Sequence, residues 1–260
     1  MATQSVVAIA GERLSPSQVR TFLECQAKWA FKYQEGLPEP ARASLTLGKA
    51  VHAALESNFR QKIESGIDLP VGEVTEFFRG TFEALRPTTE FTDEEDPAGL
   101  ADSGAAALAL YHEQVSPSIR PALVEQRLER EIGGVPVTGV IDLVDCEGLI
   151  VDFKTAAKKP SNGVSPDHAF QLATYAALSG QTNARCRVDT LVKTKTPQVI
   201  QQEHVVNDSE IRYAGIVYGR VRQSIGDAVF IPNRNSFLCS RKNCAFWREC
   251  EREFGGHVRE

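Results

Sequence analysis

The sequence lacks the features that take a chain into or across a membrane. It contains no run of 18 apolar residues. The first ten residues carry no lysine or arginine, and their apolar run is too short for a secretory signal peptide. We therefore expect a cytoplasmic protein without a membrane partner. In that reducing compartment the six cysteines are not expected to form three disulfides, so metal binding and plain burial are the alternatives.

Positive charge is also scarce, since 34 acidic residues outnumber 29 lysines and arginines and give a net charge of −5. That total argues mildly against a nucleic-acid partner. Residues 1–153, however, carry 13 basic and 24 acidic side chains (−11), whereas residues 154–260 carry 16 and 10 (+6). The second part can therefore meet a phosphate backbone locally. No Pro- or Gly-rich linker divides the 260 residues, which suffice for one large domain or two small ones.

Two acids interrupt the apolar runs between Gly139 and Thr155. Val, Ile, Leu and Phe in these runs favour two short strands, and Gly148 suits the left-handed position of a three-residue hairpin loop. A hairpin centred on that loop places Asp142 opposite Asp152. Because side chains alternate along a strand, Lys154 shares a face with Asp152.

Facing carboxylates have Cβ atoms about 5 Å apart and destabilise a sheet unless something compensates. One acid can be protonated, Lys154 can neutralise the pair, or a divalent cation can lie between them; oxygen ligands of this kind suit Mg²⁺ or Mn²⁺. A slipped register, with one acid in water and a salt bridge to Lys154, is the structural alternative.

The remaining pattern predicts an α/β protein. A strand, a helix and a second strand follow the hairpin loop, which predicts a right-handed crossover with the two strands parallel. Helices are expected over residues 15–33, 47–66, 73–85, 99–115, 165–180 and 207–225, and strands over 122–132, 187–195 and 199–206.

Three further polar residues lie on helix faces. His52 shares a face with Leu55 and Phe59 and is expected to point inward, which is more often a core position than a ligand position. Gln171 and Tyr175 lie four residues apart and project on one side of their helix, where an ordinary solvent-facing stripe is the alternative.

Three cysteines, Cys239, Cys244 and Cys250, lie within twelve residues and indicate a metal. A tetrahedral site needs a fourth ligand, which Cys25 or His257 can supply. Burial alone is expected for the two cysteines in or beside strands, Cys146 and Cys186.

With these residues in order, the chain resembles the PD-(D/E)XK nuclease superfamily, in its RecB-like branch with an iron-sulfur cluster, as in CRISPR-associated exonucleases. The segments that carry the resemblance are Gly48–His52, Gly139–Asp142, Val151–Thr155 and Gln171-x-x-x-Tyr175. Ile141 stands where the superfamily name has Pro, and Asp152 stands for Glu. The resemblance implies a restriction-endonuclease-like core, a mixed central sheet flanked by helices, with a helical amino-terminal part, in one domain over residues 1–260.

The resemblance also implies roles for residues. The implied metal ligands are His52, Asp142, Asp152 and the backbone carbonyl of Phe153, and the implied catalytic residues are Lys154, Asp142 and Asp152. The implied DNA-binding residues are Gln171, Tyr175, Lys158 and Lys159. The implied iron-sulfur ligands are Cys25, Cys239, Cys244 and Cys250. Four residues separate Cys239 from Cys244, where the family commonly has two, so zinc is the alternative occupant.

The sequence thus predicts a Mg²⁺- or Mn²⁺-dependent DNA exonuclease with a 4Fe-4S cluster. Its expected partners are single-stranded DNA or duplex ends, with a helicase or recombination protein, in DNA repair, recombination or CRISPR adaptation. The alternatives are a catalytically inactive DNA-binding or helicase-partner module of the same fold and a zinc-stapled nuclease without an iron-sulfur cluster.

Overall fold

A computed structural model describes residues 13–260 of the chain. The amino-terminal segment, where no signal peptide is predicted, lies outside the described residues. The described chain divides into two compact units. Unit 1 contains residues 13–39, Glu129–Gly139 and Arg212–Glu260, and unit 2 contains Pro40–Leu128 and Val140–Ile211. Among the described residues, no helix has the length and apolar character needed to cross a membrane.

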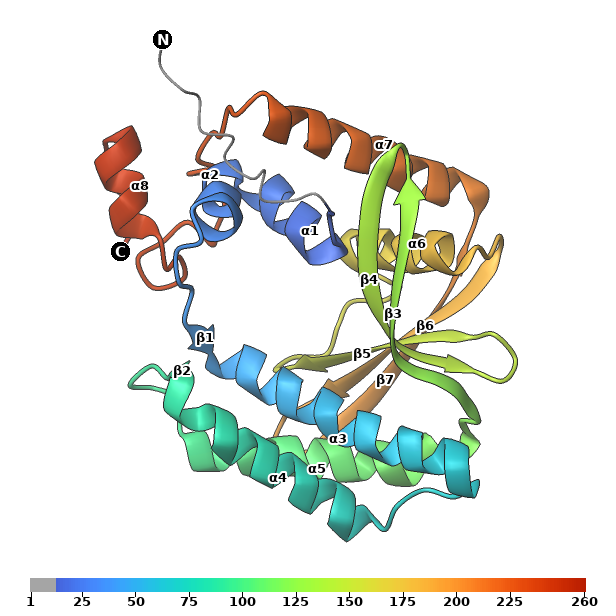
Figure 1. Ribbon diagram of the computed structural model, residues 1–260. Helices are drawn as coiled ribbons and strands as arrows, with labels where there is room; N and C mark the ends of the chain where they lie inside the picture. Colours follow the sequence, from blue (N-terminus) through green and yellow to red (C-terminus); the bar gives the residue numbers. More distant parts are fainter. Residues whose placement is uncertain (1–12) are drawn as a thin grey trace. The chain divides into compact units, whose positions relative to one another are not determined.

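A five-stranded mixed sheet is the centre of the fold (Figure 1). Its strands follow the chain in space, in the order β3-β4-β5-β6-β7. The β4–β5 and β6–β7 pairs are antiparallel, whereas β5 and β6 are parallel, as the crossover predicts. The strands are β3 (Pro121–Ile132), β4 (Val135–Asp145), β5 (Ile150–Ala156), β6 (Ala184–Val192) and β7 (Gln198–Val206).

The β4–β5 hairpin has the predicted register. Val144 pairs with Ile150, and the loop closes through a 3.0 Å hydrogen bond from the Asp145 amide to the Leu149 carbonyl. Gly148 has a φ of +82°, the left-handed conformation that the three-residue loop requires. The register matters because a shift of one residue would send every side chain of β5 to the other face of the sheet.

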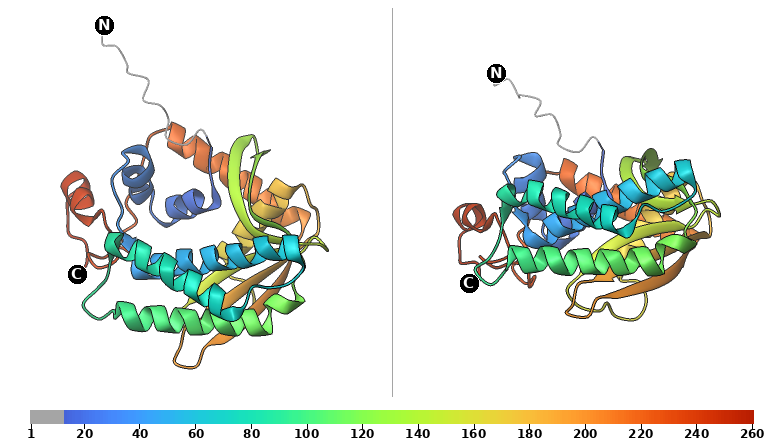
Figure 2. Two further views of the ribbon diagram at one scale, coloured as in Figure 1. Left: turned by 60° about the horizontal axis from the view of Figure 1, so that its bottom comes forward. Right: turned by 90° about the horizontal axis from the view of Figure 1, so that it is seen from below.

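Helices α3 and α5 pack against the sheet, and α4 packs on these two helices (Figure 2). Their apolar faces bury Phe59, Phe78 and Phe82 together with Val151 and Phe153 of β5. Since side chains alternate along β5, Asp152 faces the other way, toward α6, which packs on β5, β6 and β7. The helices of unit 2 are α3 (Ala43–Ser65), α4 (Val71–Leu85), α5 (Pro97–Gln114) and α6 (Pro166–Ser179), with the short strands β1 (Ala41–Arg42) and β2 (Thr89–Glu90) beside α3.

Capping residues explain where two helices begin and where one of them ends. The Ser15 and Ser165 hydroxyls accept hydrogen bonds from the third amides of α1 (Pro16–Glu24) and α6, and each helix has proline at its first position. Gly180 ends α6 in the left-handed conformation. The helix starts predicted at residues 15 and 165 are confirmed to within one residue, because these two serines are the N-caps.

The helix predicted over residues 15–33 is wrong in one respect, because it is interrupted at Cys25. This residue is extended, with φ −161° and ψ 111°, between α1 and α2 (Gln26–Trp29), and a π-helical turn, Ala30–Gln34, follows. Periodicity alone could not show the break, since the apolar stripe continues across it. Unit 1 also contains α8 (Trp247–Phe254) and the part of α7 (Asp208–Gly226) from Arg212 onward.

The turn between β3 and β4 requires glycine. Gly133 and Gly134 both have positive φ, and a Cβ on Gly133 would lie 2.2 Å from the carbonyl oxygen of Gly215 in α7. Real Cβ contacts do not come that close. The absence of a side chain therefore lets the hairpin tip pack directly on the backbone of α7.

Candidate active site

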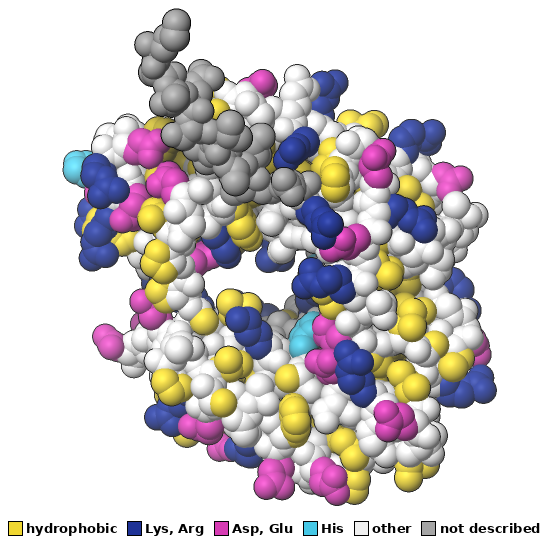
Figure 3. Space-filling view, in the orientation of Figure 1, with side chains coloured by type: hydrophobic (Ala, Val, Ile, Leu, Met, Phe, Trp, Pro, Cys, Tyr) yellow, Lys and Arg dark blue, Asp and Glu magenta, His cyan; other side chains and the backbone are white. Residues whose placement is uncertain are grey.

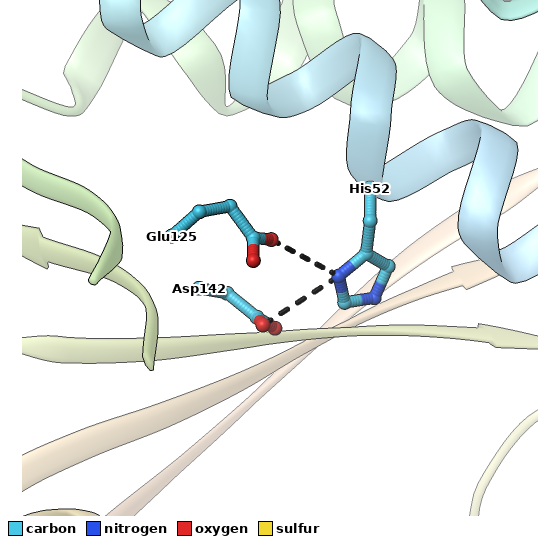
Figure 4. Close-up of side chains that lie close together, drawn as sticks. All are labelled: His52, Glu125 and Asp142. Carbon is cyan, nitrogen blue, oxygen red and sulfur yellow. Dashed lines mark ion pairs between the residues drawn. The ribbon is translucent and has the colours of Figure 1, made fainter. Parts of the chain in front are cut away.

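Three side chains from three elements of unit 2 converge on one point (Figure 4). His52 comes from α3, Glu125 from β3 and Asp142 from β4, and one ligand atom from each lies within 4.8 Å of the others. The His52 Nδ1 atom is 3.5 Å from Asp142 Oδ1 and 3.6 Å from Glu125 Oε1. His52 and Asp142 are both predicted site residues, and the structure brings them together.

Glu125 is the member that sequence reasoning missed, because its alternating stretch reads as an ordinary strand. Its φ is +48°, a conformation uncommon outside glycine, so the strand is distorted where this carboxylate turns toward His52. A signal was present in the sequence. A two-residue turn at Gly133–Gly134 pairs Ile132 with Val135, and counting outward along the two strands sets Glu125 opposite Asp142.

The two carboxylates control the charge of His52, whose side chain is 30% exposed. Burial lowers the pKa of the imidazole, but the hydrogen bond to Asp142, the charge of Asp142 and the hydrogen bond to Glu125 outweigh it and raise the pKa to about 10. At neutral pH the metal-free imidazole is therefore protonated. A histidine that binds a metal must have a neutral imidazole, so metal binding at His52 would release a proton.

The backbone of Phe153 connects β5 to this cluster. Its amide donates a 2.7 Å hydrogen bond to Asp142 Oδ2, and its carbonyl oxygen lies 3.0 Å from His52 Nε2. Its ring stacks on Phe59 and meets the His52 ring edge-on, with centroids 6.0 Å apart in each case. The carbonyl that the resemblance names as a metal ligand thus points at the predicted histidine and is fixed by packing.

Asp152 is buried, with 1% of its side chain exposed, and is paired with Lys154 Nζ at 2.5 Å. Neither carboxylate oxygen accepts a hydrogen bond of normal geometry from the described residues. Burial raises the pKa of Asp152 to about 6; the Lys154 charge opposes the rise and the Asp142 charge adds to it. Asp142 and Asp152 are close enough to repel each other, as the hairpin predicts. The group of three ligand atoms within 4.8 Å, however, contains Glu125 and not Asp152.

These donors fit a divalent cation. Carboxylates, a backbone carbonyl and an imidazole are ligands for Mg²⁺ or Mn²⁺, and buried carboxylate oxygens without hydrogen bonds are costly unless a cation approaches them. A pocket of about 460 Å³ opens beside them, within the range of about 300–1,000 Å³ typical of ligand sites. It is lined by α3 between Ser44 and Glu56, by Glu125, and by Phe153, Lys154 and Thr155.

Helix α6 supplies two of the predicted DNA-binding residues. Gln171 Nε2 donates a 2.6 Å hydrogen bond to the Tyr175 hydroxyl. Tyr175 is buried, and its pKa is raised by burial and by the charges of Asp152 and Asp142, so it lies near the acids and not on a solvent-facing stripe. The other two, Lys158 and Lys159, are exposed in the loop between β5 and α6.

The four cysteines named by the resemblance lie together in unit 1, where they line one largely apolar pocket. None of them forms a disulfide. The Asn233 amide donates to Cys25 Sγ at 3.4 Å, and burial raises the thiol pKa of Cys244 and of Cys250. The extended conformation of Cys25 thus occurs where its sulfur lines this pocket.

The spacing of the sulfurs bears on the metal. Tetrahedral zinc with sulfur ligands at about 2.3 Å holds them roughly 4 Å apart. Among the described residues, His52, Glu125 and Asp142 are the one group of three ligands within 4.8 Å of one another, so no three ligand atoms from the four cysteines and His257 are that close together. The burial prediction is correct for Cys186 and wrong for Cys146, because Cys146 lies in the exposed hairpin loop.

The family model described as PD-(D/E)XK nuclease superfamily matches residues 13–251. A solved structure of a candidate exonuclease from Eubacterium rectale is similar in fold, with a TM-score of 0.60, 13% identity, and 92% of this chain and 93% of that chain covered. The structure of SSO0001 is 13% identical over 87% of this chain and 93% of that chain, at a TM-score of 0.35. No curated protein matches the chain in sequence. The mixed sheet flanked by helices is the predicted restriction-endonuclease-like core, and the chain belongs to the PD-(D/E)XK nuclease superfamily.

Proposed function

We propose that the protein is a Mg²⁺- or Mn²⁺-dependent DNA exonuclease that hydrolyses phosphodiester bonds at ends or in single strands. The observation that carries the proposal is the convergence of His52, Glu125 and Asp142 beside the buried Asp152, which is paired with Lys154. His52, Glu125 and Lys154 line the pocket. The likeness in fold to a candidate exonuclease supports action at ends.

In this proposal the residues of the site have different roles in metal binding and in catalysis. Asp142, Glu125, His52 and the Phe153 carbonyl would hold the cation, with Asp152 beside them. A bound divalent cation supplies Lewis-acid stabilisation of the phosphate and lowers the pKa of a water molecule. Lys154 would orient that water and stabilise the charge that develops on the phosphate, because its ammonium lies on the same pocket wall.

Residues of α6 and of the loop before it would position the DNA strand. Gln171 would contact the strand, with Tyr175 fixing its amide through their hydrogen bond. Lys158 and Lys159 are exposed and form no ion pair with a described residue, so they can contact phosphates without reading sequence.

We further propose a 4Fe-4S cluster held by Cys25, Cys239, Cys244 and Cys250. The four thiols line one pocket, and no three of their sulfurs all lie within 4.8 Å of one another. A helicase or recombination protein as partner, and a role in repair, recombination or CRISPR adaptation, remain proposals that follow from the nuclease function.

End-labelled single- and double-stranded DNA tests the nuclease proposal. Purified protein is expected to shorten the labelled strands in Mg²⁺ or Mn²⁺ and to stop when EDTA removes the metal, because the bound cation would activate the attacking water and stabilise the phosphate. A time course on gels gives the polarity and strand preference. A protein that binds the same DNA but leaves it intact in every metal would instead be the inactive binding module.

Glu125→Gln tests the proposed role of Glu125 as a metal ligand, which the sequence pattern did not predict. The amide keeps the shape but removes the charge, so the concentration of Mg²⁺ at half-maximal activity is expected to rise roughly 10- to 100-fold, the range typical of weakened metal sites. Glu129→Gln on the same strand is the matched control, because Glu129 pairs with Arg13 in unit 1. An unchanged metal requirement in Glu125→Gln would exclude Glu125 as a ligand.

A further inference from the structure

The pocket in unit 2 has a second group of polar side chains besides its metal ligands. Ser44, Lys49 and Thr155 line it, and each carries a side-chain donor. None of these three side chains has a hydrogen-bond or ion-pair partner among the residues that the structure describes. The pocket thus contains two groups of polar side chains. One is Glu125 with His52, and the other is three hydrogen-bond donors that have no acceptor in the described part of the chain.

Lys49 differs in this respect from the other cations of unit 2 around it. Seven lysines and arginines between residues 40 and 155 form an ion pair with an acid: Arg42, Arg60, Lys62, Arg79, Arg86, Arg120 and Lys154. Figure 3 shows the same intermixing of basic and acidic side chains over the face it displays. Lys49 is exposed and pairs with none, so its charge is available to an anion that enters the pocket.

The backbone places this charge next to the reacting centre. Lys49 precedes His52 by three residues on α3, so the two side chains share a face of the helix. Thr155 directly follows Lys154 on β5. The two elements meet at Gly48, where an added Cβ would lie 3.7 Å from Thr155 Oγ1. Lys49 and Thr155 therefore border the same end of the pocket.

We propose that Lys49 and Thr155 form a phosphate-binding subsite that holds the DNA phosphate next to the scissile one. The inference rests on the proposed nuclease function and deepens it. A phosphodiester beside the metal ligands supplies the acceptor oxygens that both side chains lack. The ammonium binds as a point charge and the hydroxyl as a donor, so the subsite reads no sequence and acts on every nucleotide that passes.

Lys49→Gln, Lys49→Arg and Thr155→Val test the subsite, with Arg79→Gln as the control. Arg79 is on α4, outside the pocket, and its removal changes the net charge by the same amount. Binding of a fluorescein-labelled single-stranded oligonucleotide is measured by anisotropy over a range of salt, with Ca²⁺ in place of Mg²⁺. Cleavage of the same strand in Mg²⁺ gives kcat and KM, and melting curves confirm that each variant folds.

Loss of one phosphate contact is expected to reduce the salt slope of binding by about 0.7 in Lys49→Gln. Losing a charged hydrogen bond made throughout the reaction should raise KM roughly 10-fold and leave kcat within about twofold. Thr155→Val should shift KM less, Lys49→Arg should recover most of the loss, and Arg79→Gln should behave as the wild type.

The inference is overturned if Lys49→Gln matches Arg79→Gln in slope and KM, or if it lowers kcat without changing KM. The nuclease proposal fails separately. In that case the wild type would not cleave in any metal, and the salt slope of Lys49→Gln against Arg79→Gln would still decide whether the phosphate subsite exists.

Discussion

Asp152→Asn is expected to abolish metal-dependent cleavage and at the same time to stabilise the metal-free protein. Asparagine keeps the shape of the side chain but cannot carry the charge that the site needs, so the rate should fall at least about 10³-fold. Burial, followed by the charge of Asp142, raises the pKa of Asp152 from 3.8 to about 6, against the opposing charge of Lys154. The charged form is thus disfavoured in the folded chain.

The sign of the stability effect follows from proton binding. Between pH 3.8 and about 6 the folded state binds more protons at Asp152 than the unfolded state does, so the free energy of unfolding falls as the pH rises. The loss is complete above about pH 6. Asp152→Asn removes this loss of stability. It should raise the free energy of unfolding by about 1–3 kcal/mol at pH 8 and leave it unchanged at pH 3.5. Thermal melts in EDTA at the two pH values measure the difference.

Lys154→Ala is expected to change stability in the direction opposite to Asp152→Asn. It should also abolish cleavage, but it leaves the buried carboxylate without its cation and should lower the melting temperature at pH 8. Asp102→Asn, an exposed acid on α5 that pairs with Arg79, should change neither quantity. Retained activity in either Asp152→Asn or Lys154→Ala would remove the basis of the proposed mechanism.

Cys25→Ser is expected to remove the proposed iron-sulfur cluster altogether. Anaerobically purified wild-type protein should be brown, with visible absorbance and about four iron atoms per chain, whereas the variant should be colourless. The cluster would close a loop of most of the chain, so its loss should cost about 3–5 kcal/mol in the chain-entropy estimate. Iron analysis, absorbance spectra and melting curves measure these changes.

Cys146→Ser is the matched control for this experiment. Cys146 is exposed in the β4–β5 loop of unit 2 and does not line the pocket of the four cysteines. Its substitution should leave colour and stability as in the wild type. A colourless wild-type protein with one bound zinc would contradict the cluster and support the zinc alternative.

The parts of the structure that were predicted correctly depend on local chemistry. The β4–β5 register follows from an apolar pattern of period two and a glycine that can take positive φ, and both features are visible in the residues Gly139–Thr155. The start of α6 follows equally from Ser165 and Pro166. In each case the determining interactions lie within a few residues of sequence.

The parts that were missed depend on contacts between segments distant in sequence. Glu125 joins His52 and Asp142 because three elements of unit 2 meet there, and its backbone is distorted in a strand whose pattern looks regular. Cys25 leaves the helical conformation where segments more than two hundred residues later bring their own cysteines. Neither distortion follows from the apolar pattern of the element in which it occurs.

The division of the chain into two units sets an order for folding during synthesis. Every residue of unit 2 has been made once the ribosome reaches Ile211, whereas unit 1 also needs the carboxyl-terminal stretch that carries three of the four cysteines. Domains generally fold as units while translation proceeds. The nascent chain would therefore contain a folded nuclease pocket before Cys239, Cys244 and Cys250 have been synthesised. Insertion of the proposed iron-sulfur cluster would then be the last step of maturation.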